Sequence, residues 1–390
     1  MKVGVVTTSY PRFPDDPAGN FVGEHVRALR ELGHDVAVIA AADDTGTHRL
    51  YKMETAHDDV VRVSNGGLFY NSGAPDMLER DRRRALPAAM FSLRLTAAVV
   101  RRRWDSIIAH WLAPSALACV PTTAPLLAIA HGGDIHLLRR TGLLAPALHL
   151  LRARDAQLVF VSHELRDIAL AAAPRLESWL ADSRVQPMGI DVRRFDAIPR
   201  TPTTPPTLAI AARLVPIKGV DVAIAAMKHL AHRAKLVVAG IGPEMRDLVH
   251  AAYGEAGTSS PRFTIHTKSE LDQLEEKHGI GFRMALDTRG RDRLLADASI
   301  VLVPSRVIAG RSEGTPLIAL EAMAAGIPVI ASAVGGLRTL PIELVPPDDP
   351  EALARAIDRV LDRPPDSATL RKSVAHLDWR RVVATLVRSP

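Results

Sequence analysis

The 390-residue chain has little cysteine, few aromatic side chains and no long apolar run. Its single cysteine, Cys119, cannot form an internal disulfide, and no Cys/His cluster has the spacing of a zinc site, so a reducing compartment is expected. A membrane-spanning helix needs roughly 18 or more consecutive apolar residues, and the sequence holds no such run. The first residues turn polar too early for a signal peptide. We therefore expect a cytoplasmic protein.

Aromatic residues make up 4% of the chain, so the core must be built from Ala, Leu, Val and Ile. The shares of hydrophobic residues, 47%, and charged residues, 24%, are ordinary for a globular protein. A length of 390 residues suits two lobes better than one. The formal net charge of +6 suits an enzyme that handles anionic ligands, although a solvated basic surface explains it equally well.

Two series of alternating strands and helices follow one another along the chain. The first series has predicted strands at residues 3–8, 35–40, 106–110, 126–130 and 157–161 and a helix at 20–32. The second has strands at residues 207–211, 235–239, 300–304 and 329–331 and helices at 220–230 and 315–325. This alternation predicts two α/β lobes with parallel sheets, which bind ligands at the carboxyl ends of their strands.

A proline-rich segment separates the two series. Residues 198–206 cannot pack as a helix or a strand, so we place the domain boundary there. The predicted domains are a first lobe at 1–197, the linker at 198–206, a second lobe at 207–365 and a C-terminal helix at 366–390.

Two glutamates separated by seven residues form the most informative motif. Glu313 lies in a predicted loop that ends at Gly314. Thr315, Pro316 and Leu317 fall in the first turn of the predicted helix at 315–325, and Glu321 lies about two turns along it. Backbone N–H groups at a helix start can bind phosphate or a sugar hydroxyl. A carboxylate further along can accept hydrogen bonds from a ribose diol. The alternative is a glutamate that favours the helix dipole and a second, solvated one, but the small and glycine residues around them favour a ligand site.

Residues 312–326 resemble the E-x7-E motif of retaining GT-B glycosyltransferases of family 4, the group that includes glycogen-synthase-like and mannosyltransferase-like enzymes. The resemblance implies the GT-B fold, in which two Rossmann-like doubly wound lobes face each other across a cleft. It assigns Glu313 to the donor sugar and Glu321 to the nucleotide ribose. It also assigns acceptor binding to the first lobe and nucleotide-sugar binding to the second, with the C-terminal helix returning to the first lobe.

Two loops of the second lobe carry further similarity. Arg213 and Lys218 resemble the family's R-x4-K pair, and two such cations on one loop can converge on a diphosphate and stabilise its charge as it leaves. Two solvated cations are the alternative. Gly242 lies in a segment that resembles the family's G-x-G-P loop beside the nucleotide base. It is not a dinucleotide fingerprint, because Met245 stands where the third glycine belongs, and a plain tight turn is an equal alternative.

The first lobe carries two more matches. Gly19 and Asn20 resemble the glycine-bearing loop that covers the donor diphosphate, with Asn20 in place of the second glycine of the usual pair. His131 and Asp134 resemble the family's H-G-x-D motif, which implies that His131 contacts the donor sugar and that Asp134 helps to organise the acceptor side. A strand-end histidine in a glycine turn is the alternative. Looser matches at residues 161–165, 188–195, 332–337 and 378–379 extend the resemblance over essentially the whole chain.

The resemblance implies a retaining glycosyltransferase of glycan biosynthesis that moves a hexosyl group from a UDP-sugar or GDP-sugar to a hydroxyl acceptor, which could be a glycan, a lipid-linked sugar or a small molecule. We expect no cofactor, no metal requirement and no nucleic-acid partner, since Asp-x-Asp is absent and Arg213, Lys218 and the helix dipole can replace a divalent ion. Catalytic roles fall to His131, Glu313, Arg213 and Lys218. A GT-B nucleotide-sugar epimerase and a non-catalytic nucleotide-sugar-binding protein are the alternatives.

The stretch from Arg80 to Arg103 interleaves arginines with apolar residues. One apolar face with basic flanks suits peripheral attachment to an anionic membrane, here the inner surface. The alternative is a helix that packs on its sheet with solvated arginines.

Overall fold

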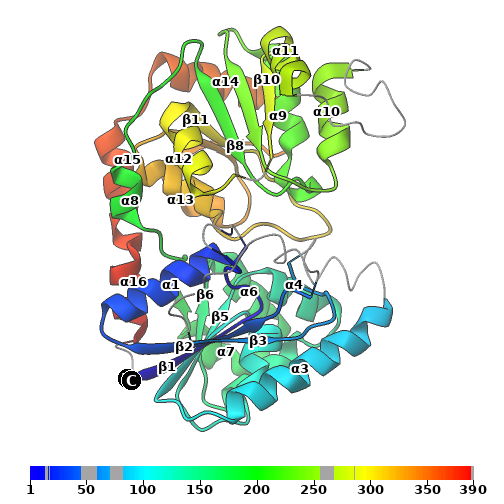
Figure 1. Ribbon diagram of the computed structural model, residues 1–390, viewed down its shortest axis with the longest axis vertical. Coiled ribbons are helices and arrows are strands. Elements are labelled where there is room, and N and C mark those ends of the chain that lie inside the picture. The colour runs from blue at the N-terminus through cyan, green and yellow to red at the C-terminus, as the bar shows by residue number, and fades with distance from the viewer. Residues whose placement is uncertain are drawn as a thin grey trace. The chain divides into compact units, whose positions relative to one another are not determined.

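The computed structural model describes residues 1–13, 16, 18–44, 59–70, 82–254, 268–284 and 286–387. The chain divides into two compact units, Met1–Gly189 with Trp379–Pro390 (unit 1) and Ile190–Asp378 (unit 2). Each unit contains one parallel β-sheet covered by helices (Figure 1). The expected class, two Rossmann-like α/β lobes, is confirmed.

Unit 1 is built on a seven-stranded sheet in the order β3-β2-β1-β4-β5-β6-β7. Its strands are β1 (Lys2–Thr7), β2 (Asp35–Ala41), β3 (Val60–Val63), β4 (Ser106–His110), β5 (Leu126–Ala130), β6 (Gln157–Phe160) and β7 (Arg184–Val185). Its helices are α1 (Asn20–Glu31), α3 (Ala85–Val100), α4 (Gly133–Arg140), α5 (Leu144–Ala153), α6 (His163–Ala172), α7 (Glu177–Ala181) and α16 (Trp379–Val387). The central strands are almost continuously apolar and buried, as parallel strands covered on both faces must be.

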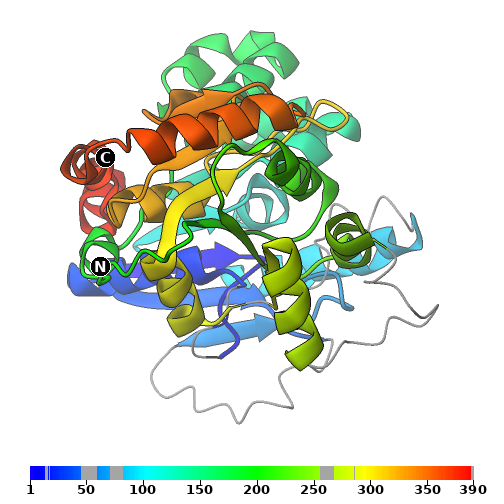
Figure 2. The ribbon, with the colours of Figure 1, turned by 90° about the horizontal axis from the view of Figure 1, so that it is seen from above.

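Unit 2 is built on a six-stranded sheet in the order β10-β9-β8-β11-β12-β13. Its strands are β8 (Thr207–Ala211), β9 (Lys235–Ala239), β10 (Ile280–Arg283), β11 (Ala298–Val303), β12 (Val329–Ser332) and β13 (Glu343–Val345). Its helices are α8 (Val192–Asp196), α9 (Val220–Ala226), α10 (Met245–Tyr253), α11 (Lys268–His278), α12 (Thr288–Asp297), α13 (Leu317–Ala324), α14 (Pro350–Asp362) and α15 (Ser367–Val374). Figure 2 shows α14, in orange-red, lying along the strands of its own unit.

The strand order reverses once in each sheet. In unit 1 β2 and β3 lie on one side of β1, and β4 lies on its other side. In unit 2 the same reversal lies between β8 and β11. Because the strands are parallel, the loops after β1 and β4, and likewise those after β8 and β11, begin at the same edge of their sheet. Such a switch point is where doubly wound sheets bind ligands. It is therefore the first place to look for each unit's site.

The chain passes from unit 1 to unit 2 after Gly189, ahead of the predicted linker at 198–206. The reason is packing, because Ile190, Phe195 and Ile198 are buried in the core of unit 2. The chain returns at Trp379, so the predicted C-terminal segment 366–390 is divided: α15 belongs to unit 2 and α16 to unit 1.

Candidate functional site

The switch point of unit 2 brings Lys218 and Glu313 together. Lys218 ends a short 3-10 helix, Pro216–Lys218, in the loop after β8, and Glu313 lies in the loop after β11. The ammonium of Lys218 forms an ion pair with Oε1 of Glu313, and the buried hydroxyl of Ser305 donates to Oε2 at 2.8 Å. Both carboxylate oxygens of Glu313 are thus engaged. Exposed Arg213 lies on the same loop, five residues before Lys218.

Arg306 connects the two loops of this switch point. Its backbone N–H donates to the carbonyl of Ile217 at 2.9 Å. Its guanidinium pairs with Asp221 at 2.9 Å, in the first turn of α9, and with Asp348 at 2.7 Å. These contacts hold the Lys218 loop against the loop that carries Glu313. Sequence reasoning missed Arg306 and Ser305, whose only signal was their position just after a buried strand.

Two glycines let backbone segments approach the site residues closely. A Cβ on Gly335 (φ 52°) would lie 1.8 Å from the carbonyl oxygen of Glu313, and the neighbouring Gly336 N–H donates to that oxygen at 3.2 Å. A Cβ on Gly242 would lie 2.1 Å from the carbonyl oxygen of Leu214, next to Arg213. Gly242 therefore lies against the loop that carries Arg213. The expected place of Gly242 beside a nucleotide base stays a prediction.

Glu321 lies on α13 with only 4% of its surface exposed. Nη1 of Arg291, from α12, pairs with Oε1 of Glu321 at 2.9 Å, and the guanidinium lies 5.4 Å from the ring centroid of Phe195. The alternative of a solvated mid-helix glutamate is therefore excluded. Sequence reasoning also missed Arg291, which has no recognisable motif around it.

The segment between the two glutamates differs from the prediction in one detail. Pro316 was expected in the first helical turn, but it has extended backbone angles (φ −60°, ψ 126°) and caps the helix, which begins at Leu317. The predicted helix at 315–325 is shorter for that reason. Gly314 and Thr315 lie in the loop that leads from Glu313 to this cap.

Three histidines form a hydrogen-bonded chain at the switch point of unit 1. Nδ1 of His25 lies 3.0 Å from Nε2 of His110, and Nδ1 of His110 lies 3.0 Å from Nε2 of His131. Burial lowers the pKa of His25 and of His131 to about 3, and lowers the pKa of His110 well below its usual value. The indole of Trp379 stacks on His25 with centroids 4.9 Å apart. The chain is therefore neutral at pH 7.

Asp134, expected on the acceptor side, has backbone partners on two loops. Its Oδ2 accepts from the N–H of Leu112 at 2.6 Å, and its Oδ1 accepts from the N–H groups of Gly132 at 3.0 Å and His131 at 3.2 Å. Burial raises the pKa of Asp134, although these hydrogen bonds oppose the shift. Asp134 thus joins the loops after β4 and β5. Its contact with an acceptor stays a prediction.

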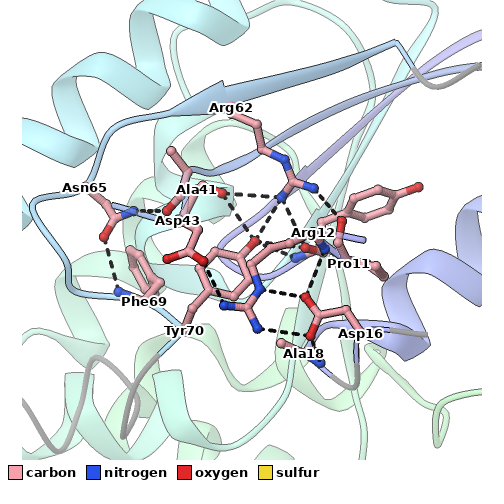
Figure 3. A network of polar contacts seen from close by, with 12 residues as sticks. Pro11, Arg12, Asp16, Ala18, Ala41, Asp43, Arg62, Asn65, Phe69 and Tyr70 are labelled. Carbon is pink, nitrogen blue, oxygen red and sulfur yellow. Dashed lines mark hydrogen bonds and ion pairs between the residues drawn. The ribbon is translucent and has the colours of Figure 1, made fainter. Parts of the chain in front are cut away.

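A network of arginines holds the loop after β1 (Figure 3). Arg12 binds Asp16 through two nitrogens, at 2.7 and 3.1 Å, and Asp43 at 2.9 Å. Arg62 donates to the hydroxyl of Tyr70 at 2.9 Å. The loop ends at Gly19 and Asn20, the predicted phosphate-covering residues: Gly19 is the N-cap of α1, and the Asn20 amide donates to Glu24 at 3.3 Å. The network fixes the positions of Arg12 and Asp16 in this loop.

The helix α3 has a buried face and an exposed apolar face. Phe91, Leu95 and Val99 are buried, and α3 packs on β2 and β3. On the other side Leu86, Met90, Leu93 and Val100 are 68%, 43%, 72% and 46% exposed. Arg94, Arg101 and Arg103 are exposed on or just after the helix. Arg80, where the predicted basic stretch begins, lies outside the described residues.

No helix in the described part of the chain is both long and apolar enough to cross a membrane. Across the described ranges, no group of His, Cys, Asp or Glu side chains has the arrangement of a metal site.

Comparison with known proteins identifies the domain that carries the Lys218–Glu313 site. Residues 191–376 match the family model of glycosyl transferases group 1, which covers nearly all of unit 2. The chain is 28% identical to the D-inositol 3-phosphate glycosyltransferase of Xylanimonas cellulosilytica, over 66% of this chain and 59% of that protein. It is 28% identical to the glycogen synthase of Mycobacterium tuberculosis, over 98% of this chain and 92% of that one.

Solved structures with the same fold cover both units. Sucrose-phosphate synthase from Thermosynechococcus elongatus has a TM-score of 0.68 at 20% identity, over all of this chain and 98% of its own. Anabaena HepE in complex with UDP-glucose has a TM-score of 0.64 at 17% identity, over the whole of both chains. The expected GT-B fold class is confirmed, and so is the expected enzyme class: the chain is a glycosyltransferase.

Proposed function

We propose that this glycosyltransferase moves a hexosyl group, with retention of anomeric configuration and without a metal ion, from a nucleoside-diphosphate sugar to a hydroxyl acceptor. The observation that carries the proposal is the ion pair between Lys218 and Glu313 at the switch point of unit 2. Arg213 lies on the same loop as Lys218. Phosphate ligands of doubly wound sheets bind at such a point.

Arg213 and Lys218 supply the positive charge that a divalent ion supplies in other transferases. The guanidinium can hold two oxygens of the diphosphate, and the ammonium can hold a third. As the bond between the anomeric carbon and the phosphate oxygen breaks, negative charge grows on the diphosphate, and both cations stabilise it. The acceptor oxygen forms the new bond on the same face of the sugar, and its proton passes to the departing phosphate oxygen.

Glu313 and Glu321 bind the two ends of the donor in this proposal. Glu313, oriented by Ser305, faces the sugar, and the buried carboxylate of Glu321, paired with Arg291, accepts hydrogen bonds from the ribose diol. Backbone N–H groups at the start of α13, at Leu317, add a positive dipole for the phosphate. In unit 1, His131 contacts the donor sugar.

The donor is a UDP-sugar or a GDP-sugar, and UDP is the preferred base. Its support is the structural likeness to HepE, which is solved in complex with UDP-glucose. The acceptor is a hydroxyl of a glycan, a lipid-linked sugar or a small molecule. The comparisons do not favour the epimerase and the non-catalytic binding protein; product analysis separates the epimerase, which would release a changed nucleotide-sugar without an acceptor.

The test replaces the two cations separately and measures turnover with a panel of UDP- and GDP-sugars. Lys218→Ala and Arg213→Ala should each lower kcat by about a hundredfold or more, the usual effect of losing a group that stabilises developing charge. Lys228→Ala removes an exposed lysine of the same unit and serves as the matched control. Circular dichroism checks that each variant is folded. Near-normal turnover in either site variant would overturn the diphosphate assignment.

We also propose that the exposed face of α3 contacts an anionic membrane. Leu86, Met90, Leu93 and Val100 recur at helical spacing on one exposed face, and exposed Arg94 and Arg101 lie beside it. Apolar side chains that enter the lipid and arginines that meet acidic headgroups are the two elements of an interfacial helix.

Sedimentation with vesicles of phosphatidylglycerol or phosphatidylcholine tests this surface. The protein should pellet with the anionic vesicles, and Leu93→Glu should abolish pelleting. Leu150→Glu introduces the same charge at an exposed leucine of α5, 53% exposed, and should pellet like the wild type. Equal pelleting of both variants, or none by the wild type, would refute the proposal.

A further inference from the structure

The three histidines of unit 1 come from three different elements and form one continuous chain. His25 lies on α1, His110 ends β4 and His131 follows β5. The two contacts join Nδ1 of one ring to Nε2 of the next, at 3.0 Å each. His25 and His110 are fully buried. The chain therefore runs in one direction, from a buried end at His25 to His131.

Only two proton arrangements satisfy both contacts. A neutral imidazole has one N–H and one bare nitrogen, and burial keeps all three rings neutral by lowering each pKa. In the first arrangement His25 donates to His110, His110 donates to His131, and His131 carries its proton on Nδ1. In the second, every proton moves to the other nitrogen, so Nε2 of His25 becomes an N–H group and Nδ1 of His131 becomes bare.

The buried end of the chain selects between the arrangements. Nε2 of His25 is buried and has no hydrogen-bond partner among the residues that the structure describes. This buried nitrogen stays unsatisfied in either arrangement, but orphaned N–H donors are rarer in proteins than under-satisfied acceptors. The indole of Trp379 stacks on the face of the ring, at an interplanar angle of 15°, where it offers no acceptor in the ring plane. The first arrangement is favoured because it leaves this nitrogen bare.

We propose that His25 and His110 fix the tautomer of His131, so that its Nδ1 carries the proton and can only donate. The ligand atom it would meet is an oxygen that accepts a hydrogen bond, such as a sugar hydroxyl or a phosphate oxygen; this identity rests on the proposed function, whereas the tautomer does not. His25 and His110 are positioning residues, since both act through His131. Phe21 and Trp111, with ring centroids 5.2 and 4.8 Å from that of His131, restrict its orientation.

Nitrogen NMR of the full chain labelled with 15N-histidine tests the tautomer directly and needs no substrate. Long-range proton–nitrogen correlations distinguish a protonated Nδ1 from a bare one, and the signals of His131 are assigned by their loss in His131→Gln. At pH 7 the expected result is a protonated Nδ1 and a bare Nε2. A protonated Nε2 with bare Nδ1, or an imidazolium, would overturn the proposal even if the enzyme transfers sugar as proposed.

A variant of the buried end tests whether the chain is the cause. His25→Phe removes the donor to His110, so His131 should become a mixture of the two tautomers. His149→Phe replaces an exposed histidine of the same unit and should leave the His131 signals unchanged. If His25→Phe folds and His131 still carries its proton only on Nδ1, the chain does not set the tautomer. If it does not fold, the wild-type spectrum alone decides.

Discussion

The ion pair between Arg291 and Glu321 allows us to work out how much free energy of unfolding is lost when one buried partner is removed. Arg291→Met removes the charge and keeps an unbranched stem against the ring of Phe195. It leaves the carboxylate of Glu321, 4% exposed, without the guanidinium that lies 2.9 Å away. Breaking a buried pair from one side costs about 3–5 kcal/mol. Because one fifth of the Arg291 side chain is exposed, at 20%, the lower end applies, and we expect about 3 kcal/mol.

Urea unfolding of the full chain, followed by circular dichroism, measures this loss. With a slope of about 3 kcal/mol per molar urea, a loss of about 3 kcal/mol lowers the midpoint by about 1 M. Arg355→Met is the matched control, since Arg355 pairs with Glu351 at 3.5 Å and both side chains are more than half exposed, at 61% and 64%. Exposed pairs contribute roughly 0–1 kcal/mol, so the control should change the midpoint little.

The double variant Arg291→Met with Glu321→Gln separates charge from packing. Once the carboxylate is neutral, losing the guanidinium should cost less than it does in the single variant, by more than about 1 kcal/mol. If Arg291→Met is no more destabilising than Arg355→Met, the burial argument is wrong. If the double variant shows additive losses, the cost arises from packing on Phe195 and not from the buried charge of Glu321.

Three further predictions follow from the two switch points. Glu313→Gln should bind free UDP about an order of magnitude more tightly, because it removes a carboxylate that competes for Lys218, while turnover should fall. Calorimetric titration measures the affinity for UDP and kcat measures the turnover. Weaker binding of UDP would show that Glu313 does not compete for Lys218. Gly242→Ala should lower kcat/KM at least about tenfold, because its Cβ would meet the Leu214 carbonyl and displace the Arg213 loop. Gly142→Ala should not, because the strain at its φ of 72° stays in a turn of unit 1 where its Cβ would meet nothing within 4 Å. Since burial lowers the folded-state pKa of His25 to about 3, only the unfolded chain protonates it between pH 6.5 and 5, so stability falls over that window. In His25→Gln this fall, measured by urea unfolding at pH 7 and pH 5, should be smaller than in the wild type by about 2 kcal/mol, and an unchanged pH dependence would contradict the lowered pKa.

The sheets could be predicted from the sequence because their strands are local apolar runs. Parallel strands are buried on both faces, so each reads as a short continuous stretch of Val, Ile, Leu and Ala, as in β8 and β11. The ends of each strand follow from where the apolar run stops. The start of α6 can also be predicted, since serine is a common N-cap: the Ser162 side chain accepts from the N–H of Leu165 at 3.4 Å.

Contacts between distant segments could not be predicted in this way. Arg291 lies thirty positions before the glutamate it pairs with, and Arg306 binds Asp221 from eighty-five positions away. No local pattern marks either arginine, because its role depends on where the fold brings its partner. The division of the chain after Gly189 has the same cause: a proline-rich segment looks like a boundary, but Phe195 before it is already buried in unit 2.

The two switch points share a topology and differ in electrostatics, and desolvation explains the difference. In unit 1 burial desolvates the three histidines, and they have no carboxylate partner in their hydrogen-bonded chain, so the rings stay neutral, held by directed hydrogen bonds. In unit 2 the side chains of Lys218 and Glu313 form an ion pair and keep 22% and 12% of their surface exposed. A neutral, oriented donor suits a sugar hydroxyl, whereas a partly solvated cation suits a diphosphate that must enter and leave. The proposed reaction needs both a neutral donor and a cation. The neutral histidines of unit 1 suit the first role, and the partly exposed Lys218 of unit 2 suits the second.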